Sequence, residues 1–395
     1  MVKKILKLLL WCVILVSLAG LLFWASLTWA LPWWVGAACY AGILGLFFGL
    51  CLVRRLLVRR RQKGLIQHVV AASSTPLADA LPGQDLEQEL RTHWAKALAD
   101  LKHSSLQRIG NPLKVMPWYL MLGESRDGKT TAIKNSQTSS PLTDVDPRAQ
   151  QQGTRNCDWW FCDQAVILDT AGRYSIPVDD TQDRKEWEVF LELLLKTRKR
   201  KALQGVIVSI AADRLLREDA LTLIRKGQMM RQRLNQLMQL TGDRLPVYLL
   251  VTKMDLVHGF TDFFQGFRNE QVEGSMGVAN SDPDCPWEQT LVQAFSTLRQ
   301  RLHSLRQVLA HTVKLEYYPG AVQFPNEFQL LREPLGQYGQ GLFGFDQYLE
   351  TPFLRGIYFS SGKHQGEPFS PFLQLIGCTP STAGAAAIRT QASND

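Results

Sequence analysis

The chain has 395 residues, 46% of them hydrophobic and 20% charged, which is enough for one large or two ordinary domains with a buried core. Its formal net charge is +8, and much of the basic excess flanks the apolar N-terminal segments. Basic residues commonly flank membrane spans, so the positive charge does not require a nucleic-acid partner. The seven cysteines show neither a C-x-x-C pair nor a zinc-ligand spacing. We therefore expect reduced thiols rather than a disulfide framework or a zinc site.

Two apolar runs predict a transmembrane hairpin with basic flanks within residues 1–61. The runs Leu8–Thr28 and Trp33–Val53 carry no charge, and each is long enough to cross a bilayer. Pro32 breaks the helix between them. Lysines precede the first run and arginines follow the second, so the positive-inside rule places both termini in the cytoplasm. A cleaved signal peptide is the alternative for the first run, and the second run directly behind it argues against that reading.

Residues 62–112 predict a linker followed by one amphipathic helix. The stretch Ala71–Asp85 contains two prolines and small polar residues, which is typical of a linker. Apolar residues then recur at helical spacing on a single stripe: Leu86, Leu90, Trp94, Leu98 and Leu101. We expect this helix to pack on the domain that follows.

The segment "GESRDGKTT", Gly123–Thr131, fits the Walker A pattern G-x-x-x-x-G-K-[ST]. The apolar run Pro117–Leu122 predicts the strand that a phosphate-binding loop follows, and "KTTAIKNS" can open the helix that comes after it. Lys129 is expected to reach the β- and γ-phosphates, and Thr130 to bind Mg²⁺. The predicted nucleotide-binding residues are Gly123, Glu124, Ser125, Arg126, Asp127, Gly128, Lys129, Thr130 and Thr131.

The string "DWWFCDQAVILDTAGRY" predicts two short strands, Asp158–Cys162 and Ala165–Leu168, joined as a hairpin. The second strand leads into the D-x-x-G motif Asp169-Thr170-Ala171-Gly172. Asp169 is placed to hold the magnesium ion through water, and the Gly172 N–H to meet the γ-phosphate. Thr154 stands before the hairpin, where a switch threonine would close on the metal. This order of motifs matches the GTPase arrangement.

Two later apolar runs, Leu203–Ala211 and Val247–Leu256, predict further buried strands. The second run contains a T-K-x-D motif, with Thr252, Lys253 and Asp255 as candidate base-binding residues. An aspartate at this place can accept hydrogen bonds from the N1–H and the exocyclic amine of guanine, while the lysine stem lies along the base. Adenine offers no such pair of donors.

Arg173 follows the D-x-x-G motif, where many GTPases place a glutamine that orients the attacking water. An arginine cannot accept a proton or orient water in the same way. Two roles stay open: Arg173 is a catalytic residue that stabilises transition-state charge, or the site hydrolyses slowly and mainly switches.

A resemblance to a known family rests on the two apolar spans and on five further strings: "PWYLMLGESRDGKTT", "GTRNCDWWFCDQAVILDTAGRY", "GVIVSIAADRLL", "LPVYLLVTKMDL" and "FLRGIYFSSGKHQGEPF". Together they resemble the IcmF/TssM family, whose members are inner-membrane components of bacterial type VI secretion systems. The resemblance extends to about Gly366, and the Walker A segment is intact. It implies assembly with the small membrane protein TssL, an IcmH/DotU relative, and contact with the cytoplasmic baseplate. Family members continue into a periplasmic region that meets the lipoprotein TssJ. Because this sequence ends at Asp395 without such a region, a truncated product or a short variant is expected, and a TssJ contact is not assigned.

The expected fold is α/β: a P-loop NTPase domain of the small-GTPase type with a mostly parallel sheet, preceded by the hairpin. We place the NTPase core at residues 113–256, a helical extension at 257–366 and an irregular tail at 367–395, with Tyr358–Gly362 as a loop that covers the nucleotide. Two functions stay open. One is a GTP- or ATP-dependent switch or NTPase, with Mg²⁺ as cofactor, in the secretion membrane complex. The other is a catalytically silent scaffold that keeps the fold for packing and partner binding.

Overall fold

The computed structural model describes residues 84–103, 112–136, 157–162, 164–176, 180–198, 203–265, 267, 275–312, 319–347, 349–362 and 367–375. The predicted hairpin, most of the predicted linker, Thr154 and the end of the predicted tail lie outside these residues. Among the helices of the described part, none is long and apolar enough to cross a bilayer. The predicted membrane spans therefore stay a prediction.

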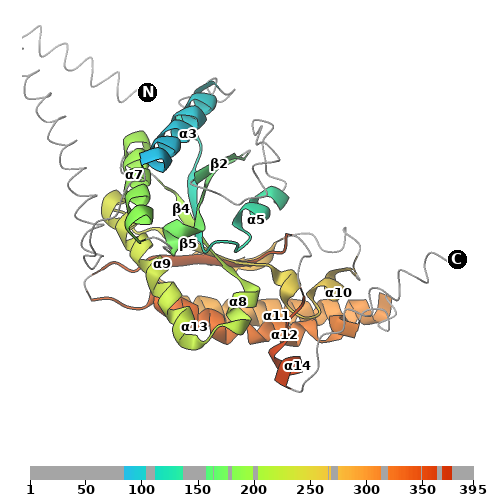
Figure 1. The fold of residues 1–395 in the computed structure, drawn as a ribbon. Helices are drawn as coiled ribbons and strands as arrows, with labels where there is room; N and C mark the ends of the chain where they lie inside the picture. Colours follow the sequence, from blue (N-terminus) through green and yellow to red (C-terminus); the bar gives the residue numbers. More distant parts are fainter. Residues whose placement is uncertain are drawn as a thin grey trace, which may run out of the picture. The chain divides into compact units, whose positions relative to one another are not determined.

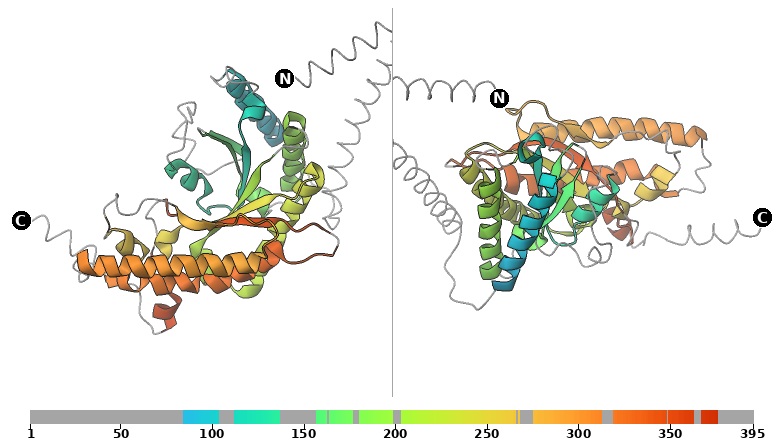
Figure 2. Two further views of the ribbon diagram at one scale, coloured as in Figure 1. Left: turned by 180° about the vertical axis from the view of Figure 1, so that it is seen from behind. Right: turned by 90° about the horizontal axis from the view of Figure 1, so that it is seen from above.

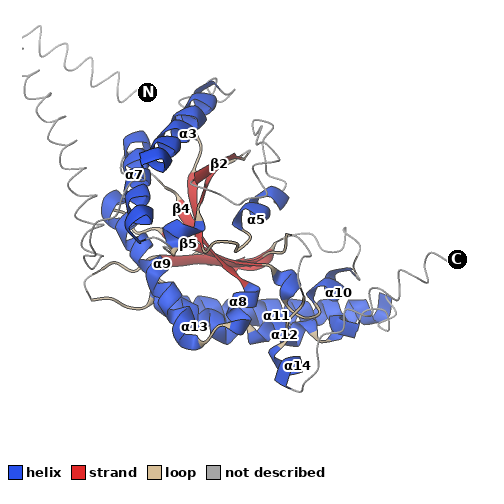
Figure 3. Ribbon diagram, in the orientation of Figure 1, coloured by secondary structure: helices blue, strands red, loops and turns tan. Residues whose placement is uncertain are grey.

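A seven-stranded sheet, drawn in red in Figure 3, forms the centre of the described residues. Its strand order is β2-β3-β1-β4-β5-β7-β6. The strands are β1 (Trp118–Gly123), β2 (Cys157–Phe161), β3 (Val166–Thr170), β4 (Gly205–Ala211), β5 (Pro246–Thr252), β6 (Met276–Ala279) and β7 (Phe353–Phe359). The five inner strands run parallel, and the edge strands β2 and β6 pair antiparallel with β3 and β7. Inner strands covered on both faces need nearly continuous apolar runs, which "GVIVSIA" in β4 supplies. The expected α/β fold with a mostly parallel sheet is confirmed.

Helices connect and cover the strands (Figure 1). They are α3 (Gln84–His103), α4 (Pro112–Val115), α5 (Lys129–Asn135), α6 (Gly172–Ser175), α7 (Asp180–Arg198), α8 (Ala212–Arg217), α9 (Ala220–Thr241), α10 (Phe260–Gln265), α11 (Trp287–Thr312), α12 (Phe324–Leu330), α13 (Arg332–Phe343) and α14 (Pro371–Leu375), with short 3₁₀ turns at Met254–Leu256 and Pro319–Val322. Helix α11 packs along β6 and β7 and against α12 and α13, as the rear view shows (Figure 2).

Two sequence expectations differ from the structure. The strand expected over Val247–Leu256 ends at Thr252, because Lys253 adopts a left-handed φ of 54° and a 3₁₀ turn follows. The region after Val257 is mainly helical as expected, but it also contributes the edge strand β6. This strand is only four residues long and lies half-exposed, so it lacks the apolar run that marks the inner strands.

The two faces of the sheet have separate cores, as the adjacent tryptophans of β2 show. Successive strand residues point to opposite faces. The Trp159 ring packs edge-on against Trp94 of α3 and Trp118 of β1, with centroid separations of 4.8 and 4.9 Å. Trp160 instead belongs to a buried cluster with Met121 of β1 and Ile133 of α5. The predicted packing of the amphipathic helix is confirmed for Leu90, Trp94 and Leu101, all of which are buried.

Candidate nucleotide-binding site

The Walker A segment, Gly123–Thr131, joins the carboxyl end of β1 to helix α5. Strand β1 lies between β3 and β4 in the sheet. The strand order therefore reverses at β1: the chain continues from β1 to β3 on one side of it, and then passes back to β4 on the other side. In open parallel sheets, ligands bind at such a reversal, outside the carboxyl ends of the strands. Gly128 precedes α5 with φ of 80°, a left-handed conformation that a side chain would strain.

Lys129 lies across the beginning of the Walker A segment. Its Nζ donates to the carbonyl oxygens of Gly123, at 3.0 Å, and Glu124, at 2.9 Å, and only 6% of the residue is exposed. Burial lowers the pKa of Lys129 from its ordinary value, and the charges of Asp169 and Asp127 partly offset that effect. The ammonium group is thus fixed over the loop, and it has three donors, of which the two carbonyls use two.

Thr130 and Asp169 form the second element of the site. The Thr130 hydroxyl donates to Oδ2 of Asp169 at 2.5 Å, and Asp169 is fully buried at the end of β3. The structure therefore brings together the two predicted metal-binding residues, which are 39 positions apart in the sequence. The neighbouring Thr170 hydroxyl donates to the carbonyl of Met121 and ties β3 to β1 immediately below the loop.

Gly172, the glycine of the D-x-x-G motif, packs against the Walker A segment. A Cβ atom added at Gly172 would collide with the backbone nitrogen and Cα of Ser125. Only a glycine permits this approach, and the contact places the start of α6 directly beside the loop. The two motifs are therefore neighbours in space, as their order in the sequence predicts.

The T-K-x-D motif also reaches the Walker A segment. The Thr252 hydroxyl donates to the carbonyl of Asp127, and the Lys253 stem lies near Gly128. Oδ1 of Asp255 accepts a hydrogen bond of 2.5 Å from Ser361, in the loop after β7. The residues of the motif thus have distinct positions: Thr252 holds the loop, while Asp255 lies where two strand ends meet.

The loop after β7 closes against the other side of α5. The Asn135 side chain donates to the carbonyl of Gly362, and a Cβ at Gly362 would meet Thr131. The Ser360 carbonyl accepts from the Met254 N–H at 3.2 Å. The segment expected to cover the nucleotide is therefore adjacent to both the Walker A helix and Asp255.

Arg173 is held by α7. Its guanidinium pairs with Glu186 at 2.6 Å and with Asp183 at 3.3 Å, and both carboxylates are buried. Burial lowers the pKa of Arg173, but the hydrogen bond and charge of Glu186 outweigh it, so the pKa is raised overall. In this conformation the guanidinium is committed to α7. Its predicted catalytic role stays a prediction, as does that of Thr154, which lies outside the described residues.

Sequence reasoning missed two cations beside the loop. Arg214 of α8 pairs with the carboxylates of Glu124 and Asp127, and Lys226 of α9 contacts Glu124 at 2.8 Å. The position of Arg214 shortly after the apolar run of β4 was an available signal, because the carboxyl ends of parallel strands share one edge. No local pattern marks Lys226, which lies 102 positions from its partner.

Comparison with known proteins identifies the family. A model of the IcmF-related N-terminal domain matches residues 180–394, more than half of the chain. The chain is also 35% identical over 326 residues to the type VI secretion system component TssM1 of Pseudomonas aeruginosa. The chain belongs to the IcmF/TssM family. The predicted resemblance to this family is thereby confirmed.

The extent of these matches matters for the site. The similarity to TssM1 covers 79% of this chain and 29% of that protein, so the chain spans less than a third of its relative's length. The domain match begins after the Walker A and D-x-x-G motifs. A contiguous match of the extent found with TssM1, in contrast, necessarily includes both motifs of this IcmF/TssM chain.

Proposed function

We propose that this IcmF/TssM protein binds a nucleoside triphosphate, GTP or ATP, at the Walker A segment. The observation that carries the proposal is the joint placement of Lys129 over the loop and of Thr130 against Asp169. The first supplies a fixed cation for the phosphates, and the second supplies two oxygen donors at the adjacent strand end. Helix α5 begins at Lys129, so the loop leads directly into it.

The donor set fits Mg²⁺ in particular. Mg²⁺ prefers hard oxygen ligands and is usually held through one or two protein groups together with substrate phosphates and water. The hydroxyl of Thr130 and the carboxylate of Asp169 are such ligands. A bound Mg²⁺ would neutralise charge on the phosphates. The described residues hold no cluster of three or more His, Cys, Asp or Glu side chains that would instead form an all-protein cage.

The choice of base rests on Asp255, whose carboxylate suits the paired donors of guanine. The Lys253 stem, which lies near Gly128, is the proposed surface against which the base stacks. Hydrolysis is a separate question, because Arg173 is paired with α7 and cannot orient water as a glutamine does. We expect slow turnover and a switch-like role, with Thr154 closing on the metal.

The family membership supports a place for the chain in a type VI secretion membrane complex. On this proposal the predicted hairpin holds the protein in the bacterial inner membrane with both termini in the cytoplasm, and nucleotide binding drives or gates assembly. TssL and baseplate proteins are the proposed partners. A contact with TssJ is not assigned to this chain.

A catalytically silent scaffold is the second candidate. The ion pairs of Arg173 with two buried carboxylates favour it, because they fix the D-x-x-G segment onto α7. A scaffold keeps the same fold and partner surfaces without nucleotide turnover.

Equilibrium titration of the full chain with Mg·GTP and Mg·ATP tests the proposal. Lys129→Ala should abolish binding, since it removes the cation fixed over the loop. Lys134→Ala, in the last turn of the same helix, is the matched control and should bind as the wild type does. Phosphate release from the same samples separates a working NTPase from a silent binder. Unchanged affinity in Lys129→Ala contradicts the assignment.

A further inference from the structure

Arg214 makes three contacts to the Walker A segment, although it belongs to none of the Walker A, D-x-x-G and T-K-x-D motifs. It lies in α8, immediately after β4, at the same edge of the sheet. Its Nη2 donates to the carbonyl of Ser125 at 3.0 Å, its Nε lies 3.1 Å from Oδ1 of Asp127, and its Nη1 pairs with the Glu124 carboxylate. One side chain therefore spans backbone and side-chain groups of three of the four variable loop positions.

These contacts place a positive charge beside two carboxylates of the Walker A segment. Glu124 and Asp127 place two carboxylates in a loop that is proposed to hold anionic phosphates. Asp127 is 2% exposed, so water screens its charge weakly. Burial raises the pKa of Asp127 to about 7, and the charge of Arg214 is the largest effect opposing that rise. Lys129 supplies one positive charge from the other side of the loop.

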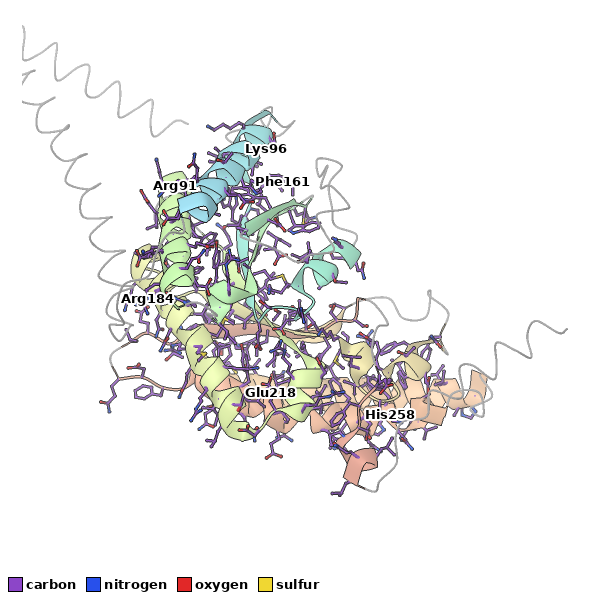
Figure 4. All side chains as sticks on the ribbon, viewed as in Figure 1. Arg91, Lys96, Phe161, Arg184, Glu218 and His258 are labelled. Carbon is purple, nitrogen blue, oxygen red and sulfur yellow. The ribbon has the colours of Figure 1, made fainter. Side chains whose placement is uncertain are left out.

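Arg214 also fixes the shape of the loop. Asp127 accepts the Glu124 N–H on Oδ2 at 2.8 Å, which closes a turn over the variable positions. The Arg214 guanidinium contacts the carboxylates of Glu124 and Asp127, and it donates a hydrogen bond to the Ser125 carbonyl within that turn. Lys226 holds the Glu124 carboxylate a second time and reaches Glu218 at 2.5 Å, at the junction of α8 and α9 (Figure 4).

We propose that Arg214 is a positioning residue of the nucleotide site: it neutralises Glu124 and Asp127 and holds the loop in the shape that accepts phosphates. The inference rests on the proposed nucleotide binding and adds a residue outside the Walker A, D-x-x-G and T-K-x-D motifs. A planar guanidinium is suited to this task, because it reaches several acceptors at once in a fixed geometry.

The test is a charge-rescue series in the full chain, with Mg·GTP and Mg·ATP affinity as the readout. Arg214→Ala should weaken binding by about 10- to 100-fold, the range that corresponds to losing hydrogen bonds to charged groups. Adding Glu124→Gln to Arg214→Ala should recover a large part of that loss, because the unneutralised carboxylate is then gone. Arg214→Lys keeps the positive charge but lacks the planar guanidinium with its several donors. Its nucleotide affinity should therefore lie between those of the wild type and Arg214→Ala.

Arg217→Ala is the matched control, since Arg217 lies on the same helix but stacks on Phe369 at 4.8 Å. It should bind as the wild type does. Wild-type affinity in Arg214→Ala, or a loss that Glu124→Gln does not recover, overturns the inference while leaving the proposed function intact, provided that Lys129→Ala abolishes binding. Absence of binding in the wild type overturns both. An unfolding midpoint for each variant separates a lost fold from a lost site.

Discussion

On the proposed function, Asp255 is the residue that would distinguish guanine from adenine. Its carboxylate is nearly buried and is fixed by Ser361, so it presents acceptors in one orientation. A fixed acceptor can distinguish bases by their paired donors, whereas a mobile one cannot.

Asp255→Asn should weaken Mg·GTP binding by about 10- to 100-fold, because the amide replaces an acceptor with a donor. Xanthosine triphosphate has a carbonyl where guanine has its exocyclic amine, so the variant should bind it better than the wild type does. Competition against a fluorescent nucleotide measures both affinities. Equal preference for GTP in the two proteins would remove Asp255 from the base site.

The buried carboxyl of Asp127 is expected to make the free energy of unfolding depend on pH. Its folded-state pKa is raised by burial from 3.8 to about 7. The folded state therefore holds the proton more tightly than the unfolded state does. The stabilisation is fully present below about pH 3.8 and is lost as the pH rises through about 7.

Asp127→Asn cannot titrate, so its free energy of unfolding should lack this component. Between pH 4 and pH 8, the free energy of unfolding of the wild type should fall by up to about 4 kcal/mol relative to that of the variant. Urea unfolding of both proteins at several pH values measures the difference. Parallel pH profiles for wild type and variant would show that Asp127 does not titrate in this range.

At the scale of elements, helix α3 is anchored to the sheet through Trp94. The indole contacts Trp159 and Phe190 at 4.8 and 5.7 Å, and its Nε1 donates to Thr197 of α7 at 3.0 Å. Helix α3 is thus part of the core although its sequence precedes the first strand.

Trp94→Ala should lower the free energy of unfolding by about 3–5 kcal/mol, through lost burial and the cavity that remains. Lys96→Ala, at an exposed position of the same helix (Figure 4), should change it by less than about 0.5 kcal/mol. Chemical denaturation gives both values. A small effect of Trp94→Ala would mean that α3 is not docked in solution.

Particular elements show how far the sequence leads. Strands β1, β3, β4 and β5 were predictable because each is a dense apolar run, and a recognisable motif also follows β1, β3 and β5. The edge strand β6 was not, because "MGVA" gains its conformation from pairing with β7 rather than from its own composition. Local pattern predicts a buried strand well and a half-exposed edge poorly.

The residues of the candidate site also fall into a group that the sequence predicts and a group that it does not. The Walker A and D-x-x-G residues are predictable from spacing, since a phosphate site demands fixed residue types in a fixed order. Arg214 and Lys226 were missed because their roles depend on pairing with Glu124 across about ninety and one hundred positions. The position of Arg214 after an apolar run places it at the same edge of the sheet as the loop, but the ion pairs themselves are visible only in the structure.

At the scale of the whole molecule, α9 connects the candidate site to the helical layer. Lys226 holds Glu124 of the Walker A segment, and the next residue, Gly227, packs directly on α13. A Cβ at Gly227 would collide with the carbonyl oxygen of Tyr338, so the two helices touch through their backbones. A change at the loop therefore has a short structural route to α13, within the part of the chain that the structure describes.

The central claim is that Gly123–Thr131 holds the phosphates of a nucleotide. Hydrogen–deuterium exchange of the full chain, with and without Mg·GTP or Mg·ATP, tests it most directly because it reports where the ligand acts. Nucleotide bound at this loop should slow exchange in peptides covering Gly123–Thr131 and Asp169–Gly172, and Lys129→Ala should lose that protection. Unchanged exchange in both segments at millimolar nucleotide would contradict it.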